Sequence, residues 1–224
     1  KGRLRPAADQ FADRRGRVVI NDASTRIEMG EKVLVTGESG SGKSTLVRAL
    51  AGLWPWGSGR VLLPAGVPLT FVPQRPYLPV GSLRDILLYP HGGRTVEDGA
   101  LHAAMTRCGL GTFIRRLDET GTRWDQALSG GERQRIAFCR LLIQRPAIII
   151  MDEATSALDE DSQVSLLSLL REDLSSATVI SVGHRPGIED FHDRTITLTR
   201  KEAGAELTSR RLPKSLWHML WRLT

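Results

Sequence analysis

Four short apolar runs constrain the fold of this chain more than any other feature of its sequence. They span residues 33–35, 69–72, 147–151 and 178–182, and each leads directly into polar or glycine-rich residues. Apolar runs that do not alternate with polar residues are typical of strands buried on both faces of a mostly parallel sheet. Helical patterns at 43–53, 132–144 and 162–170 lie between these runs. The sequence therefore predicts an α/β fold, a mostly parallel sheet wound by helices.

The stretch between the second and third runs has a different character. Residues 80–127 contain short helical pieces interrupted by glycines, which indicates a helical lobe inserted into the sheet-forming part. We expect one domain, with a core of residues 1–74 and 128–224 and a helical subdomain at 75–127. Further strands at 17–20, 60–63, 194–199 and 206–209 are expected at the periphery, with a small antiparallel β part near the N-terminus.

The segment GESGSGKS directly follows the first run and satisfies the pattern G-x-x-x-x-G-K-[ST] between a strand and a helix. Glycines let backbone N–H groups converge on phosphate oxygens, and the positive end of the next helix favours the negative charge. Lys43 is expected to reach the outer phosphates and the Ser44 hydroxyl to bind Mg²⁺. The predicted nucleotide-binding residues of this segment are Gly37, Glu38, Ser39, Gly40, Ser41, Gly42, Lys43, Ser44 and Thr45.

Asp152 and Glu153 follow the third run. Adjacent side chains at a strand end point in different directions, so one carboxylate can serve the Mg²⁺ shell while the other faces an attacking water. Two acidic residues can also simply open the next turn. Their place after a buried strand, in a chain that has a phosphate loop, favours the catalytic interpretation.

The segment LSGGERQR begins as a capping box, with Ser129 as N-cap and Glu132 three residues later. A capping box does not explain Gly130 and Gly131, because two glycines weaken a helix start unless something approaches the backbone closely. This segment resembles the signature motif of ABC transporter ATPase domains. In that family the motif contacts the γ-phosphate of ATP held by a partner domain.

The other motifs of that family follow in order. GESGSGKS resembles Walker A, Gln74 the Q-loop glutamine, AIIIMDE Walker B, SALD at 156–159 the D-loop, and His184 the switch histidine. The resemblance implies a P-loop NTPase fold of the RecA-like type and an ATPase that uses ATP and Mg²⁺. It implies catalytic roles for Glu153, His184 and Gln74, a metal site of Ser44, Gln74 and Asp152, and γ-phosphate contacts from Ser129, Gly130 and Gly131.

Finer features, including the sequence VPQRPYLPVGSLRDILLYP, are similar to the subfamily D half-transporters, a group of peroxisomal fatty-acyl and bacterial BacA-like proteins. That resemblance implies a head-to-tail homodimer, a membrane domain upstream of Lys1, and a place at the cytoplasmic face of a bacterial inner membrane. The alternative is a soluble ABC-type ATPase that acts on nucleic acid or ribosomes, which would use the net charge of +6. Because the arginines are scattered, a solvated surface is the simpler interpretation of that charge, and we expect no nucleic acid partner.

The two cysteines and the aromatic residues near the two ends of the chain allow three further expectations. Cys108 and Cys139 are too few and too far apart for a disulfide framework, so both are expected to be free thiols. Phe11 is the only aromatic residue before Gly37 and is the candidate for stacking on adenine. Trp217 and Trp221 fall on one face of a C-terminal helical pattern, and we expect them to pack on their own domain rather than on a partner.

Overall fold

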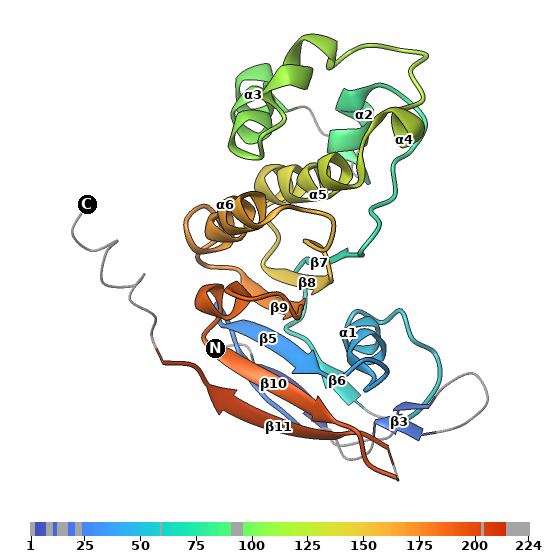
Figure 1. Cartoon of the computed structure of the whole chain (residues 1–224), viewed down its shortest axis with the longest axis vertical. Coiled ribbons are helices and arrows are strands. Elements are labelled where there is room, and N and C mark those ends of the chain that lie inside the picture. Colours follow the sequence, from blue (N-terminus) through green and yellow to red (C-terminus); the bar gives the residue numbers. More distant parts are fainter. Residues whose placement is uncertain are drawn as a thin grey trace. The chain divides into compact units, whose positions relative to one another are not determined.

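The computed structural model describes residues 3–7, 11–12, 18–20, 24–58, 60–90, 96–202 and 204–213 (Figure 1). Internal contacts divide the chain into two compact units. Unit 1 consists of Lys1–Phe71, Ala147–Glu153 and Ser175–Thr224, and unit 2 consists of Val72–Pro146 and Ala154–Leu174. The expected helical subdomain at 75–127 falls within unit 2.

A six-stranded sheet organises unit 1, in the order β11-β10-β5-β9-β8-β7. Its strands are β5 (Lys32–Gly37), β7 (Leu69–Val72), β8 (Ile148–Asp152), β9 (Thr178–Val182), β10 (Arg194–Thr199) and β11 (Glu206–Arg211). Strands β10, β5, β9 and β8 pair in parallel, and β11 pairs antiparallel with β10. All four predicted apolar runs are strands of this sheet, and every residue of β8 and β9 is buried. The predicted mostly parallel α/β fold is confirmed.

The expected peripheral strands are also present, with one difference. Strand β10 does not lie at an edge, because it pairs with β5 on one side and with β11 on the other. A small N-terminal antiparallel part is confirmed. It comprises a sheet of order β4-β1-β6 and the pair β2-β3. Its strands are β1 (Arg3–Ala7), β2 (Phe11–Ala12), β3 (Val18–Ile20), β4 (Ile27–Glu28) and β6 (Arg60–Leu62).

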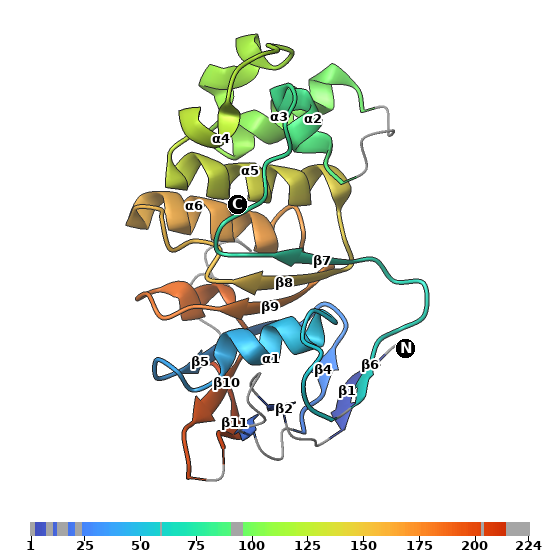
Figure 2. The same ribbon diagram turned by 90° about the vertical axis from the view of Figure 1, so that its right-hand side faces the viewer.

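Helix α1 (Lys43–Leu50) packs against β5, β8 and β9 (Figure 2). Leu46, Val47 and Leu50 are buried on the side of α1 that joins the apolar core beneath it. The strands contribute alternate side chains to the same core, such as Val33 and Val35. This packing holds the beginning of α1 beside the carboxyl ends of the strands, which is where ligands bind in open α/β sheets.

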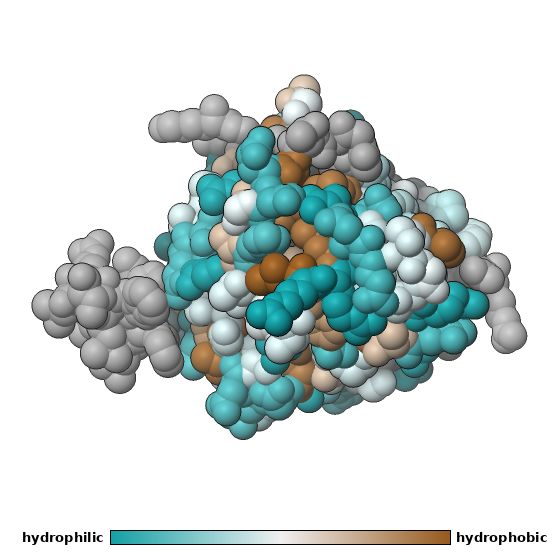
Figure 3. Space-filling view, turned by 90° about the horizontal axis from the view of Figure 1, so that it is seen from above, coloured by the Kyte–Doolittle hydropathy of each residue, from teal (hydrophilic) through white to brown (hydrophobic). Residues whose placement is uncertain are grey.

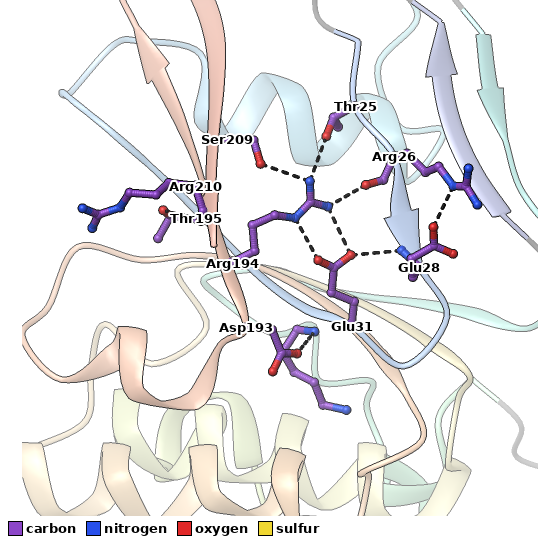
Figure 4. Close-up of polar contacts among 10 residues, drawn as sticks. Thr25, Arg26, Glu28, Glu31, Asp193, Arg194, Thr195, Ser209 and Arg210 are labelled. Carbon is purple, nitrogen blue, oxygen red and sulfur yellow. Dashed lines mark hydrogen bonds and ion pairs between the residues drawn. The ribbon is translucent and has the colours of Figure 1, made fainter. Parts of the chain in front are cut away.

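Arg194 fastens the start of β10 to the segment that leads into β5 (Figure 4). Its Nε and Nη2 donate to the two carboxylate oxygens of Glu31 at 2.8 and 3.1 Å, and Nη2 also donates to the Arg26 carbonyl at 2.6 Å. Its Nη1 donates to the Thr25 and Ser209 hydroxyls. A bidentate Arg–carboxylate pair of this kind fixes geometry as well as charge. It links the start of β10 to the residues before β5, the strand that ends in the glycine-rich loop.

Unit 2 is helical, and α5 (Gly130–Gln144) lies between α6 (Glu160–Arg171) and the helices α2 (Leu83–Leu88) and α3 (Asp98–Arg107) (Figure 1). Shorter pieces are η1 (Gly111–Arg116) and α4 (Trp124–Ala127), and a further 3₁₀ turn, η2 (Ile188–Phe191), belongs to unit 1. Phe138 and Trp124 are buried in the helical unit. The Arg140 guanidinium donates to the Ile86 and Tyr77 carbonyls at 2.8 and 2.9 Å, and burial lowers its pKa to about 10.

The face of unit 2 that is seen from above is mainly hydrophilic, with a hydrophobic strip near its centre (Figure 3). Among the described helices, none combines the length and the hydropathy that crossing a bilayer requires. Cys108 and Cys139 are both buried and unpaired, as predicted. A contact from the Cys108 thiol, together with burial, raises the pKa of Cys139, which keeps its sulfur neutral.

Candidate functional site

The glycine-rich loop joins β5 to α1, in the strand–loop–helix context that the sequence predicted. Gly37, Gly40 and Gly42 have φ angles of 140°, 75° and 97°, which only glycine adopts freely. A Cβ atom at Gly37 would lie 2.4 Å from the backbone oxygen of Leu198, so a side chain does not fit there. The loop can thus run close to β10 and present its N–H groups ahead of α1.

Lys43, the first residue of α1, folds back over the loop. Its Nζ donates to the carbonyl oxygens of Gly37 and Glu38, both at 2.8 Å. The Ser41 Oγ is buried and accepts or donates no hydrogen bond within the described part of the chain. A cation and an unsatisfied hydroxyl in a glycine-rich loop ahead of a helix are suited to an anionic oxygen-rich ligand.

Asp152 ends β8 and is only 3% exposed. Its Oδ1 accepts a hydrogen bond from the Ser44 hydroxyl at 2.7 Å, and its Oδ2 accepts one from Arg48 Nη2 at 2.9 Å. Two of the predicted metal-site residues, Ser44 and Asp152, are therefore side by side in unit 1. Arg48 was not predicted. It lies four residues after Ser44 on α1, a spacing that places both side chains on one face of the helix.

Glu153, the residue after β8, has φ +50°, a left-handed conformation that is unusual for a side chain of this size. Its N–H donates to the Val182 carbonyl at 3.2 Å, which ties it to the end of β9. Its carboxylate Oε1 lies 3.8 Å from His184 Nδ1, and the His184 side chain is 69% exposed. Left-handed strain of about 1–3 kcal/mol persists where surrounding structure requires it. Unit 1 thus gathers the predicted loop, Asp152, Glu153 and His184 at one set of strand ends.

The predicted capping box is present in unit 2. Ser129 is the N-cap of α5, its Oγ accepts from the Glu132 N–H at 3.2 Å, and its own N–H donates to Glu132 Oε2 at 2.7 Å. The two glycines have a steric cause within the unit. A Cβ at Gly130 would lie 3.2 Å from the Ala157 Cβ, and one at Gly131 would lie 3.3 Å from the Ala157 oxygen.

Gln74 is exposed and belongs to unit 2, where its Nε2 donates to the Ser156 Oγ at 3.4 Å. Both residues also contact Gln134, a buried residue of α5. Gln134 lies within LSGGERQR, but no role was predicted for it. The sequence gives no local signal for this contact, because Gln134 and Gln74 are 60 residues apart. The side chain of Phe11 and residues Trp217 and Trp221 lie outside the described part, so those predictions stay open.

Comparison with known protein families identifies the family to which this chain belongs. Residues 20–156 match the model of the ABC transporter family. The chain belongs to this family. The matched range contains the glycine-rich loop, the LSGG segment and Asp152.

Individual relatives point to subfamily D. An uncharacterized ABC transporter ATP-binding protein of Synechocystis is 42% identical over 79% of this chain and 27% of its own length. The ATP-binding cassette sub-family D member 3 of Mus musculus is 36% identical over 80% of this chain and 28% of its own length. The chain thus spans less than a third of these relatives. They confirm the resemblance to subfamily D and give no support to the alternative of a nucleic-acid or ribosome ATPase.

A solved structure supports the fold. The ATP-bound structure of a bacterial Atm1-family ABC exporter superposes with a TM-score of 0.79 at 28% identity, over 100% of this chain and 40% of that one. The chain is accordingly an ABC transporter ATP-binding domain with the P-loop NTPase fold.

Proposed function

We propose that this chain is the motor domain of a membrane transporter, which binds Mg-ATP on residues 37–45 and hydrolyses it. The observation that carries the proposal is the grouping of Lys43, Ser44, Asp152, Glu153 and His184 at adjacent strand ends in unit 1. Phosphoryl transfer to water needs phosphate positioning, charge neutralisation and an oriented nucleophile. This group of side chains can meet each need.

The donor set fits Mg²⁺. The Ser44 hydroxyl and the Asp152 carboxylate are hard oxygen ligands within 2.7 Å of each other, and resemblance adds the Gln74 amide oxygen. When bound, the ion neutralises charge that develops on the phosphate oxygens. Arg48 already balances the buried charge of Asp152 through its 2.9 Å ion pair.

The remaining residues act on the nucleotide and the water. Lys43 now bonds two carbonyls of its own loop, and a phosphate oxygen is a stronger acceptor that would draw its Nζ outward. Glu153 can accept the proton of the attacking water and keep it oriented, while His184, 3.8 Å away, can donate to the γ-phosphate.

The signature residues Ser129, Gly130 and Gly131 would complete the site of a second copy. Their helix start offers backbone N–H groups to an anion. The sequence contains one GESGSGKS loop and one LSGG segment, so two copies in a head-to-tail pair would form two equivalent composite sites. The membrane domain of the transporter is the further partner, which places this chain at the cytoplasmic face of the membrane, the inner membrane in a bacterium.

Two matched substitutions test the proposal. Glu153→Gln should lower ATP turnover by about 10²–10⁴-fold while ATP affinity stays close to that of the parent, because the amide keeps the shape but accepts no proton. Lys43→Ala should weaken ATP binding as well, because it removes a phosphate contact. Both are measured by equilibrium binding of a fluorescent ATP analogue and by phosphate release. Full turnover in Glu153→Gln would refute the proposed role of Glu153.

A further inference from the structure

Gln134 is a polar residue in the interior of unit 2, on the second turn of α5, and is only 2% exposed. Its amide makes three hydrogen bonds to other segments. Nε2 donates to the Gln74 carbonyl at 3.1 Å and to the Ser156 Oγ at 3.2 Å, and Oε1 accepts from the Ala157 N–H at 2.9 Å. A buried amide satisfied in this way rigidifies the groups that it joins.

The contact region around Gln134 is also sterically tight. Gly130 and Gly131 leave just enough room for Ala157, since a Cβ on either would come within 3.2 or 3.3 Å of it. Gln74 Nε2 adds a direct bond to Ser156. Three segments that are far apart in sequence therefore meet within unit 2: the residues around Gln74, the start of α5, and the turn at 156–159.

We propose that Gln134 is a positioning residue that holds these three segments in one arrangement, so that a shift in any one of them moves the other two. The inference rests on the proposed function, in which those segments serve the Q-loop, the signature motif and the D-loop. Only a neutral amide offers both the donors and the acceptor that the three partners need. A carboxylate would face the Gln74 carbonyl without a proton, and an apolar side chain would leave Ala157 N–H without its acceptor.

Loss of the Gln134 amide should affect two steps of the ATP cycle differently: the binding of ATP and the closing of two copies. The phosphate loop and its Lys43 belong to unit 1, so loss of the Gln134 amide should leave the first binding of ATP unchanged. The closing of two copies needs Ser129, Gly130 and Gly131 held in place, and that step should weaken. A residue that served stability alone would not divide binding from closure in this way.

The experiment uses the 224-residue chain with Glu153→Gln to prevent turnover. Gln134→Met has nearly the same length and shape but no hydrogen-bonding amide. Gln144→Met is the matched control on the same helix, because within the described part of the chain Gln144 donates to the Tyr89 carbonyl, at 2.8 Å, and makes no hydrogen bond to the three segments. ATP affinity is measured with a fluorescent ATP analogue, and dimer dissociation is measured by sedimentation with Mg-ATP.

Gln134→Met should weaken the dimer about tenfold and change ATP affinity by less than about twofold, with Gln144→Met like the parent in both. Ser156→Ala should weaken the dimer too, and adding it to Gln134→Met should give less than the product of the two effects, since they act through one network. Parental dimerisation in Gln134→Met would overturn the inference. If Gln134→Met does not fold, Ser156→Ala decides, and parental dimerisation in that variant overturns it. A parent that shows no ATP-dependent dimer refutes the proposed function itself.

Discussion

The ion pair between Arg48 and Asp152 predicts a stability change that depends on the metal. Asp152 is almost fully buried, and its two oxygens accept from Ser44 and Arg48. Arg48→Met keeps the aliphatic stem and removes the charge that balances Asp152. The change should therefore destabilise the protein when no ion replaces the guanidinium, and matter less when Mg²⁺ with ATP is bound.

The size of the effect follows from burial. Hydrogen bonds to charged groups contribute about 1.5–3 kcal/mol. The Arg48 side chain is 46% exposed, so solvent screening reduces this to about 1 kcal/mol. For a domain of this length, about 1 kcal/mol lowers Tm by roughly 2–4 °C.

The assay is thermal unfolding in the Glu153→Gln background, with ATP, with and without Mg²⁺. Arg107→Met is the matched control, because Arg107 is 49% exposed and pairs with Glu172 and Asp173 in unit 2. Its Tm loss should be the same in both conditions, whereas that of Arg48→Met should shrink when Mg²⁺ is present. An equal loss in both conditions for Arg48→Met would refute the reasoning.

Three further outcomes are expected. Gly37→Ala should lower the free energy of unfolding, measured with denaturant, by about 2 kcal/mol or more, because its Cβ would lie 2.4 Å from the Leu198 oxygen. The same change should weaken ATP binding. Gly40→Ala should lower the free energy of unfolding by less, because its Cβ would have no atom within 4 Å. Hydrogen bonds from the Ser82 hydroxyl and backbone lower the pKa of Asp85, so its stabilising effect is complete above about pH 4 and is lost as pH falls through the folded-state pKa. The Tm difference between parent and Asp85→Asn should therefore close in acid, and a constant difference would contradict this account. Phe138→Ala, at a fully buried position of α5, should lower the unfolding free energy by about 3–5 kcal/mol, measured with urea.

The sheet was predictable because its central strands are continuous apolar runs, and such runs are buried on both faces. Strand β10 was harder to place. Ile196 and Leu198 are buried, whereas Thr195 and Thr197 are only partly covered, so its alternation was typical of an edge strand although it pairs on both sides. A small antiparallel part near the N-terminus was predicted, but its strands β1, β2 and β4 were not located individually. They are short or contain polar residues and Pro6, and their pairing depends on partners elsewhere in the chain.

The residues of the candidate site also fall into those that could be predicted from the sequence and those that could not. The loop at 37–44, the capping box at Ser129 and the acidic pair at 152–153 are local patterns, so their residue types and spacing were enough. Arg48 and Gln134 act through partners 104 and 60 residues away, and no local pattern distinguishes them from other helix residues. For Gly130 and Gly131 the sequence predicted that another group approaches the backbone closely. Within unit 2 that group is Ala157.

The central claim is that each ATP is shared between two copies of this domain, between the loop of one and Ser129-Gly130-Gly131 of the other. The most direct test measures ATP hydrolysis per molecule of this 224-residue chain as its concentration rises, for the parent and for Ser129→Arg. Turnover per molecule of the parent should rise with concentration toward a plateau, because the active species is a pair, and Ser129→Arg should stay near background because its side chain blocks the approach. Turnover that does not depend on concentration, or a Ser129→Arg variant as active as the parent, would contradict the account.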